Sequence, residues 1–235
     1  MGWERYRVGV LEQLQRAFEA NREAIPAAAD LIVRTVQADG IVHVFGSGHS
    51  QLVALDVAGR AGGLAGVNPL FDPLFGRAER LEGFAPLLLA VHSFQPADVL
   101  IVISHSGRNP APIEVALHGK AHGLPVIAVT AVAFSRSMSS RHSSGKRLFE
   151  IADVVLDTLG VPGDAAVSLG PGIAVGPTST VVGAALLQAV MVEAAARLLA
   201  RGIQPPVFRS GNLEGADAHN RALRERYRGR VQWVV

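Results

Sequence analysis

Two short segments of this sequence combine glycine, serine and histidine in a pattern suited to binding an anion. Gly46-Ser-Gly-His-Ser50 and Ser104-His-Ser-Gly107 each follow an apolar run and precede a helical stretch. Glycine lets the backbone approach a ligand closely, serine hydroxyls donate hydrogen bonds, and the N-terminus of a helix favours phosphate. A third hydroxyl-rich segment, Thr178-Ser-Thr180, begins the most apolar helical stretch. Three such segments in one chain favour anion binding over simple turns.

Two other nucleotide-binding patterns fit these residues less well. The dinucleotide fingerprint needs a third glycine after Gly46-Ser-Gly48 and an acidic residue about 20 positions further on, and the sequence has neither. The P-loop pattern is also missing from the sequence. The anion is therefore not expected to belong to one of those two nucleotide sites.

An alternation of apolar strands with helices must position these segments. Strands are predicted at 41–45, 65–70, 98–103, 125–130 and 152–156, and helices at 51–61, 109–123, about 178–201, and 217–228. Two further helices are predicted within 3–38, with a break between them near Asn21 and Pro26. The segment 160–177 is rich in glycine and proline and is predicted to be a loop. Strands that are apolar throughout and separated by helices indicate a parallel sheet covered on both faces. We expect a three-layer α/β/α sandwich in one domain, 1–235, with N-terminal helices (1–38), a sheet core (39–201) and a tail (202–235).

The composition narrows the class of protein further. The chain has 235 residues, of which 49% are hydrophobic, and it contains no cysteine, which excludes disulfides and thiol catalysis and suits a cytoplasmic protein. Its 22 basic and 20 acidic residues leave a net charge of only +2. Aromatic residues make up 6%, and no nucleic-acid reading motif occurs, so we expect no nucleic-acid partner. The sequence has no run of 18 apolar residues, so we expect no membrane span. Scattered histidines do not predict a metal, and no cofactor is implied.

The three hydroxyl-rich segments together resemble the signature loops of the sugar isomerase (SIS) domain family. The likeness covers about residues 35–200, including Ser104-His-Ser-Gly-Arg-Asn-Pro-Ala-Pro-Ile-Glu114 and Gly176-Pro-Thr-Ser-Thr180. The stretches 140–148 and 212–220 are similar to bacterial sugar isomerase domain proteins related to phosphoheptose isomerase. The resemblance implies a flavodoxin-like SIS fold and a sugar-phosphate ligand. It also implies that the phosphate or the sugar hydroxyls contact Ser47, Ser50, Ser104, Ser106, Thr178 and Ser179.

One departure from the family pattern concerns the catalytic base. In phosphoheptose isomerases and muramic acid phosphate etherases, a catalytic glutamate lies on the helix after the first loop. The matching position here falls near Arg60, and the nearest acidic residue is Asp56, one turn earlier on the same helix face. This difference argues against transferring either mechanism to the chain unchanged.

Three residues are therefore candidates for acid–base chemistry: His219, His49 and Asp56. His49 lies within the first loop, where its charge would serve anion binding equally well. Asp56 can instead form an ion pair with Arg60, and Glu114 is better placed to interact with its helix dipole than to act in catalysis. By resemblance to SIS enzymes whose site is completed by a C-terminal histidine, often from a neighbouring subunit, His219 is the third candidate.

The sequence thus predicts a phosphosugar-binding protein that isomerises a sugar phosphate between aldose and ketose forms. A non-catalytic phosphosugar sensor and an amino-sugar phosphate lyase or etherase remain the alternatives. The helix at 178–201 carries hydrophobic residues on more than one face, which predicts a homodimer or a larger homo-oligomer.

Overall fold

A five-stranded parallel sheet forms the centre of the computed structural model, which describes residues 1–232. The strand order is β2-β1-β3-β4-β5. The strands are β1 (Val42–Gly46), β2 (Val67–Leu70), β3 (Val99–Ile103), β4 (Val126–Thr130) and β5 (Val154–Asp157). All five predicted strands are therefore confirmed, within three residues at each end.

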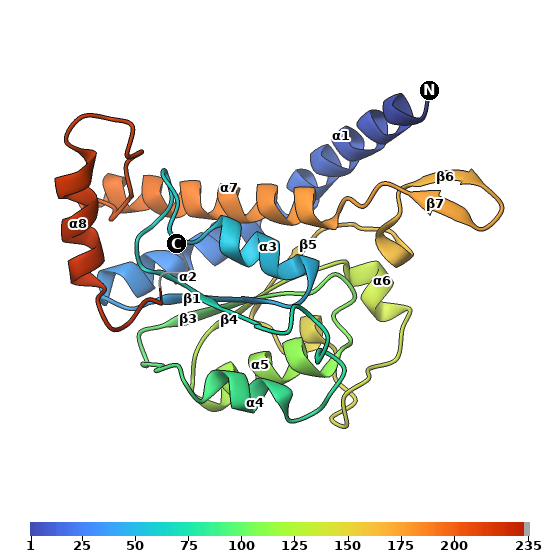
Figure 1. The fold of residues 1–235 in the computed structure, drawn as a ribbon, viewed down its shortest axis with the longest axis horizontal. Coiled ribbons are helices and arrows are strands. Elements are labelled where there is room, and N and C mark those ends of the chain that lie inside the picture. The colour runs from blue at the N-terminus through green and yellow to red at the C-terminus, as the bar shows by residue number, and fades with distance from the viewer. Residues whose placement is uncertain (233–235) are drawn as a thin grey trace.

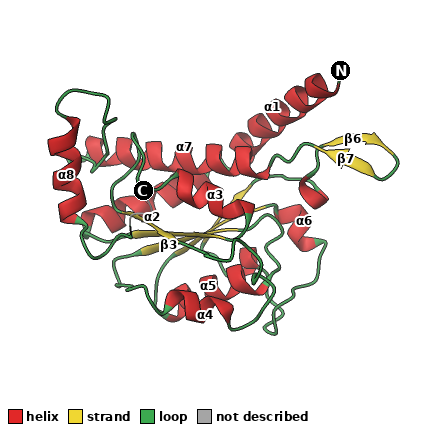
Figure 2. Cartoon of the chain, in the orientation of Figure 1, coloured by secondary structure: helices red, strands yellow, loops and turns green. Residues whose placement is uncertain are grey.

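Helices cover both faces of this sheet (Figure 2). On one face lie α2 (Ala24–Gln37), α3 (His49–Asp56) and α7 (Ser179–Ala200), and on the other lie α4 (Phe84–Leu89) and α5 (Pro110–Ala121). Strand β3 shows why two layers are needed, because Val99 and Ile101 belong to the first core cluster whereas Leu100 and Val102 belong to the second. Neighbouring side chains of a strand point to opposite faces. The predicted three-layer α/β/α sandwich is confirmed.

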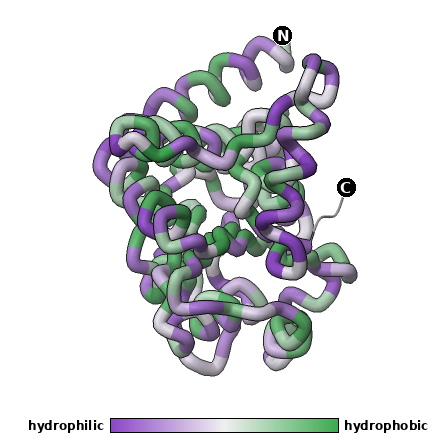
Figure 3. Tube along the Cα trace, turned by 90° about the vertical axis from the view of Figure 1, so that its left-hand side faces the viewer, coloured by the Kyte–Doolittle hydropathy of each residue, from purple (hydrophilic) through white to green (hydrophobic). Residues whose placement is uncertain are grey.

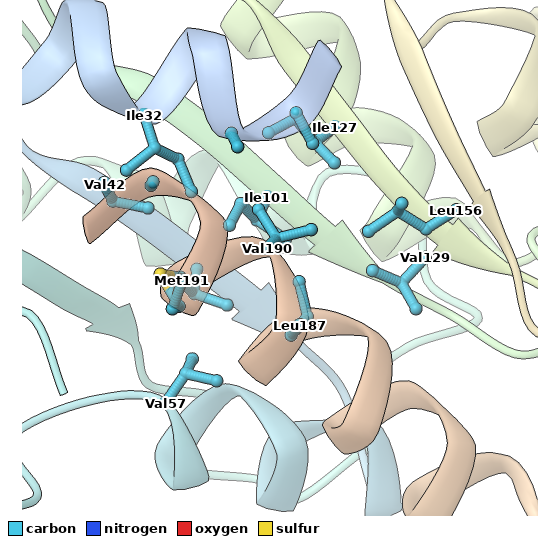
Figure 4. Packing of buried hydrophobic residues seen from close by; sticks show 14 of the residues in the cluster. Ile32, Val42, Val57, Ile101, Ile127, Val129, Leu156, Leu187, Val190 and Met191 are labelled. Atoms are coloured by element: carbon cyan, nitrogen blue, oxygen red, sulfur yellow. The ribbon is translucent and has the colours of Figure 1, made fainter. Parts of the chain in front are cut away.

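The larger core cluster lies between the sheet and helices α2, α3 and α7 (Figure 4). Ile32 of α2, Ile101 of β3 and Val190 of α7 are fully buried there. Burial of each such side chain stabilises the fold by about 1.5–3 kcal/mol. Helix α7 is thus held on one side by the sheet and on another by α2, within the same chain.

The N-terminal helix α1 (Gly2–Ala20) leaves the body of the protein beside a hairpin of β6 (Val167–Gly170) and β7 (Ile173–Val175) (Figure 1). Figure 3 shows α1 projecting beyond the body with hydrophobic and hydrophilic residues interspersed along it. Arg5 and Tyr6 attach α1 to the segment 168–177, because their side chains donate to the carbonyl oxygens of Ser168 (2.8 Å) and Pro177 (2.9 Å). The hairpin was predicted to be a loop, because its glycines and proline obscure the alternation of a strand.

The remaining elements are short or lie outside the sheet core. They are α6 (Val132–Arg136), two 3-10 turns (Leu148–Glu150 and Pro162–Asp164) and α8 (Ala216–Arg226). Helices α4 and α6 were not predicted, and the helix predicted at 51–61 ends at Asp56, where a turn begins.

Helix α7 is long and apolar enough to span a membrane by length and composition alone, but 44% of its apolar window is buried within the fold. A core helix of a soluble protein has the same composition, and the position of α7 against the sheet explains its hydropathy without a bilayer. The cytoplasmic location remains a prediction.

Helix α8 packs at the amino ends of the strands, at the opposite end of the sheet from α6 (Figure 1). Tyr227, just after α8, is 1% exposed and lies in a small cluster with Ile41 and Ala65, at the starts of β1 and β2. Arg230 donates to the buried carboxylate of Asp98 (3.2 Å) beside β3. The C-terminal tail is therefore part of the packed body rather than a solvated extension.

Candidate functional site

The two predicted anion loops meet at the carboxyl edge of the sheet. They follow β1 and β3, which are neighbours even though β2 lies between them in the chain. In sheets of this order the strand connections diverge at that point and leave a crevice where ligands bind. A cavity of about 390 Å³ lies there, within the usual range for small-molecule sites. Its lining includes Ser47, Ser50, Glu79, Arg80, Ser104, His105, Ser106, Arg108, Asn109, Phe134, Arg141 and Asp164.

The first loop is fixed by a buried carboxylate from the segment after β2. Asp72 is 0% exposed and accepts hydrogen bonds from the Ser47 hydroxyl (2.7 Å) and from the N–H groups of Leu74 (2.9 Å) and Gly76 (2.8 Å). Its own N–H donates to Gln51 in α3 (2.6 Å). Since the only proton of the Ser47 hydroxyl is given to Asp72, Ser47 positions the loop in this structure and is not free to donate to a phosphate.

Glycine allows the segment 72–80 to lie directly against the first loop. Gly76 has a φ of +84°, and a Cβ at this position would lie 2.9 Å from the Cα of Gly48. No other residue satisfies both the positive φ and the close backbone approach without strain. This contact, together with Asp72, brings the following residues Glu79 and Arg80 into the cavity.

Three of the predicted hydroxyls remain able to donate to a ligand. Among the described residues, the hydroxyls of Ser50 and Ser106 have no hydrogen-bond partner. The oxygen of Ser104 accepts from the N–H of Gly107 (3.2 Å), which leaves its own proton free. All three residues line the cavity. They supply the neutral donors that a phosphate needs.

The backbone of the second loop adds further donors, whereas the first turn of α5 does not. Within the described part of the chain, the N–H groups of His105, Ser106 and Arg108 make no hydrogen bond. In α5, Pro110 and Pro112 have no N–H, and the N–H of Ala111 donates to the carbonyl oxygen of Glu79 (3.0 Å). An anion here would thus be bound by the loop itself rather than by the helix terminus that the sequence suggested.

The start of α7 already carries a carboxylate. Asp164 accepts hydrogen bonds from the N–H groups of Thr178 (3.0 Å) and Ser179 (2.9 Å) and from the Ser179 hydroxyl (2.5 Å). Such a carboxylate satisfies the free N–H groups and the dipole of the helix N-terminus. Thr178 is fully buried. Ser179 is therefore not free to bind phosphate in this structure, and the Thr178 hydroxyl, although it has no partner among the described residues, is buried and out of reach of a ligand.

Glu79 is the acidic residue best placed for proton transfer. Its Oε1 accepts a hydrogen bond from Nδ2 of Asn109 (2.7 Å), and its carbonyl oxygen accepts from Ala111, so side chain and backbone are both held by the start of α5. Burial raises the pKa of Glu79 above its ordinary value, although the positive charges of Arg80 and Arg141 act against the shift. A half-buried carboxylate with a raised pKa, lining a ligand cavity, is a typical general base.

Three arginines line the same cavity, and none of them forms an ion pair within the described residues: Arg80, Arg108 and Arg141. The Nε of Arg108 is buried and has no hydrogen-bond partner there. Within the described chain, the guanidinium group of Arg141 donates only to the neutral amide of Asn109 (2.9 Å). Burial, followed by the charges of the other two arginines, lowers the pKa of Arg141. Crowded guanidinium groups without carboxylate partners indicate that the cavity accepts an anion.

His105 lies in the wall of the cavity, and its ring is held in place by the chain. Its Nε2 lies 2.9 Å from the carbonyl oxygen of Val161, and because a carbonyl only accepts, Nε2 carries the proton. In the neutral ring Nδ1 then has a lone pair, and this atom is buried without a partner in the described chain. Because Nδ1 packs beside Gly160 and has no open surface, it does not face a ligand in this conformation.

The three predicted acid–base residues lie outside this cavity in the single chain. His49 is exposed and its ring contacts Phe75 (5.9 Å between centroids), while Asp56 pairs with Arg60 and accepts from Gln188 of α7 (2.9 Å). His219, on α8, lies 2.9 Å from the carbonyl oxygen of Val207 and is at the far end of the sheet. A contribution of His219 to the cavity of a neighbouring subunit remains a prediction.

Sequence reasoning missed Glu79, Arg80 and the role of Arg141. The only signal for the first two was topological, because the segment after a parallel strand leaves the sheet at the same edge as the loops after its neighbours. Arg141 lies in a basic stretch of the sequence, and because such stretches usually form solvated surface, nothing local marks its side chain as part of a cavity. Among residues 1–232 no group of three or more His, Asp or Glu side chains could hold a metal ion.

Comparison with known proteins shows which family has this architecture. A family model described as SIS domain matches residues 5–131, slightly more than half of the chain. The chain belongs to the SIS-domain family. A protein of Geobacillus thermodenitrificans described as UPF0309 protein is 41% identical, with the alignment covering 99% of this chain and 97% of the relative.

Solved SIS structures share the fold. The phosphoheptose isomerase of Francisella tularensis superposes with a TM-score of 0.57 at 18% identity, covering 81% of this chain and 95% of that one. The sugar isomerase domain of the RpiR transcription factor of Sphaerobacter thermophilus superposes with a TM-score of 0.51 at 20% identity, covering 93% of both chains. Because one is described as an isomerase and the other as a transcription factor, the SIS fold alone does not separate catalysis from sensing.

Proposed function

We propose that this SIS protein is a sugar-phosphate isomerase that interconverts an aldose phosphate and a ketose phosphate. The observation that carries the proposal is that Glu79, a carboxylate with a raised pKa, shares one cavity with the free hydroxyl and N–H donors of loop 104–109. Isomerisation needs a base beside the carbonyl carbon and a separate site that holds the phosphate. Glu79 is the group that we propose for the first role, in place of a glutamate near Arg60, and loop 104–109 is the one that we propose for the second.

In this proposal Ser104, Ser106 and Arg108 hold the phosphate, and Glu79 moves the proton between C2 and the carbonyl carbon C1 of the aldose. The reaction class needs no redox cofactor. A phosphosugar sensor without catalysis is the second candidate, and it shares the phosphate site but not the role of Glu79.

The phosphate site is tested by the double variant Ser104→Ala/Ser106→Ala. Each hydroxyl donated to a charged group is worth about 1.5–3 kcal/mol, so affinity for sugar phosphates should fall at least tenfold while the fold survives. Calorimetry on a panel of aldose, ketose and amino-sugar phosphates measures this, with Ser93→Ala, remote from the cavity, as the control. Unchanged affinity in the double variant would move the phosphate elsewhere. Binding without any exchange of substrate hydrogen with solvent would favour the sensor.

A further inference from the structure

The cavity holds more positive charge than the phosphate loop requires. Three hydroxyls and three N–H groups from residues 50 and 104–108 are free to donate, which is enough for the oxygens of one phosphate. Arg108 belongs to that loop and lies beside those donors. Arg80 and Arg141 come from two other segments, which follow β2 and β4, and they need a separate explanation.

These two guanidinium groups flank the candidate base. Arg80 follows Glu79 directly in the chain, and Arg141 donates to the Oδ1 of Asn109 (2.9 Å), whose Nδ2 holds the Glu79 carboxylate (2.7 Å). Both arginines act electrostatically on Glu79, which puts their charges near the candidate base, and Arg108 acts in turn on Arg141. Neither Arg80 nor Arg141 is ion-paired with Glu79 or with another carboxylate of residues 1–232.

We propose that Arg80 and Arg141 are catalytic residues that stabilise the negative charge developing on the sugar's carbonyl oxygen while Glu79 removes the neighbouring proton. This inference rests on the proposed isomerase function and adds to it the group that stabilises the intermediate. Preorganised positive groups aimed at an oxygen that becomes charged are usually the largest single contribution to catalysis.

The electron and proton balance of the step is as follows. The Glu79 carboxylate takes the proton from C2 of the aldose, the C–H electron pair forms the C1–C2 double bond, and the carbonyl π pair moves onto O1. The resulting enediolate oxygen is the anion that the two guanidinium groups bind. Glu79 then returns its proton to C1, and the O2 hydroxyl proton passes to O1, which gives the ketose. No oxidant or reductant takes part.

Aldonate phosphates provide the probe, because their carboxylate places a negative oxygen where the enediolate carries one. We would measure by calorimetry the affinities of two matched pairs, 6-phosphogluconate with glucitol 6-phosphate and 5-phosphoarabinonate with arabinitol 5-phosphate. The members of each pair differ only in a carboxylate against a hydroxymethyl group. In the better-bound pair we expect the unaltered protein to bind the aldonate at least tenfold more tightly.

Variants then assign the preference to residues. Arg80→Ala and Arg141→Ala should each remove most of it and leave the alditol affinity within about threefold, because the alditol has no charge for them to bind. Arg77→Ala is the matched control, since Arg77 is an exposed arginine of the same segment outside the cavity lining. Ser104→Ala/Ser106→Ala should weaken both members of a pair equally.

Each other result overturns the proposal in a recognisable way. An aldonate preference that persists in both arginine variants, or the absence of any preference, removes the catalytic role of the pair. Equal losses of aldonate and alditol affinity would assign Arg80 and Arg141 to the phosphate. If the Ser104→Ala/Ser106→Ala variant binds as the unaltered protein does, or if neither pair binds at all, the proposed function fails first.

Discussion

Replacement of Asp72 by asparagine tests how the cavity is assembled. The two carboxylate oxygens of Asp72 accept three hydrogen bonds at 2.7–2.9 Å, from Ser47, Leu74 and Gly76, in a fully buried position. Asparagine must place its NH2 group where one of these oxygens lies. In either orientation the NH2 faces a backbone N–H, of Leu74 or of Gly76, and that donor loses its acceptor.

The expected cost follows from these contacts. A buried N–H without an acceptor costs about 1–3 kcal/mol, and each remaining bond loses about 1 kcal/mol when the acceptor is no longer charged. We therefore expect Asp72→Asn to lower the free energy of unfolding by about 3 kcal/mol and Tm by roughly 6–12 °C for a chain of this length. Urea and thermal unfolding measure the change, and faster tryptic cleavage at Arg77 and Arg80 would report the loosened segment.

A matched control is Asp56→Asn, because Asp56 is also an aspartate near the first loop but its side chain is 36% exposed. A partly exposed pair of this kind contributes about 1 kcal/mol or less. If Asp72→Asn costs no more than this control, Asp72 does not anchor the loop, and the placement of Glu79 needs another explanation.

Three further predictions concern the base, the buried Asp98 and the assembly. Glu79→Gln keeps the acceptor for Asn109 and should reduce turnover of the substrate about 10²–10⁴-fold with phosphate affinity unchanged. Burial raises the pKa of Glu79, and the base must be ionised to act. Turnover of the unaltered protein should therefore rise with pH only above 4.5, the ordinary pKa of glutamate. Burial raises the pKa of Asp98, but hydrogen bonds from His43 and from the N–H groups of Gln95 and Ile41 outweigh it, so the folded pKa is lowered. The stabilisation by ionised Asp98 is then complete above the pKa of the unfolded chain and is lost as pH falls through the pKa of the folded protein. Asp98→Asn should therefore lower the free energy of unfolding by about 3 kcal/mol at pH 7 and by progressively less below about pH 4. Urea unfolding at a series of pH values measures this. The exposed apolar side chains of α1, such as Trp3 and Leu11, should be covered by a second copy of the chain. Sedimentation should therefore give at least a dimer, and Leu11→Arg should dissociate it. A monomer of the unaltered protein at micromolar concentration would contradict this.

The sequence alone determined the sheet and the position of its two candidate anion loops. A strand such as Val99–Ile103 could be predicted because it is buried on both faces and therefore reads as a continuous apolar run. The glycine and serine loops that follow β1 and β3 could be predicted because their conformation depends on local residue type. Neighbouring parallel strands then bring those loops together whatever their separation in the chain.

Only the tertiary structure decided which side chains face the ligand. A hydroxyl is free or engaged according to partners distant in the chain, so Ser47 and Ser179 are held by Asp72 and Asp164 while Ser106 remains free. Glu79 enters the cavity because Gly76 packs on Gly48 and because α5 binds its backbone and side chain. No local pattern encodes such contacts, because they depend on where separate segments meet and not on the residues within either one.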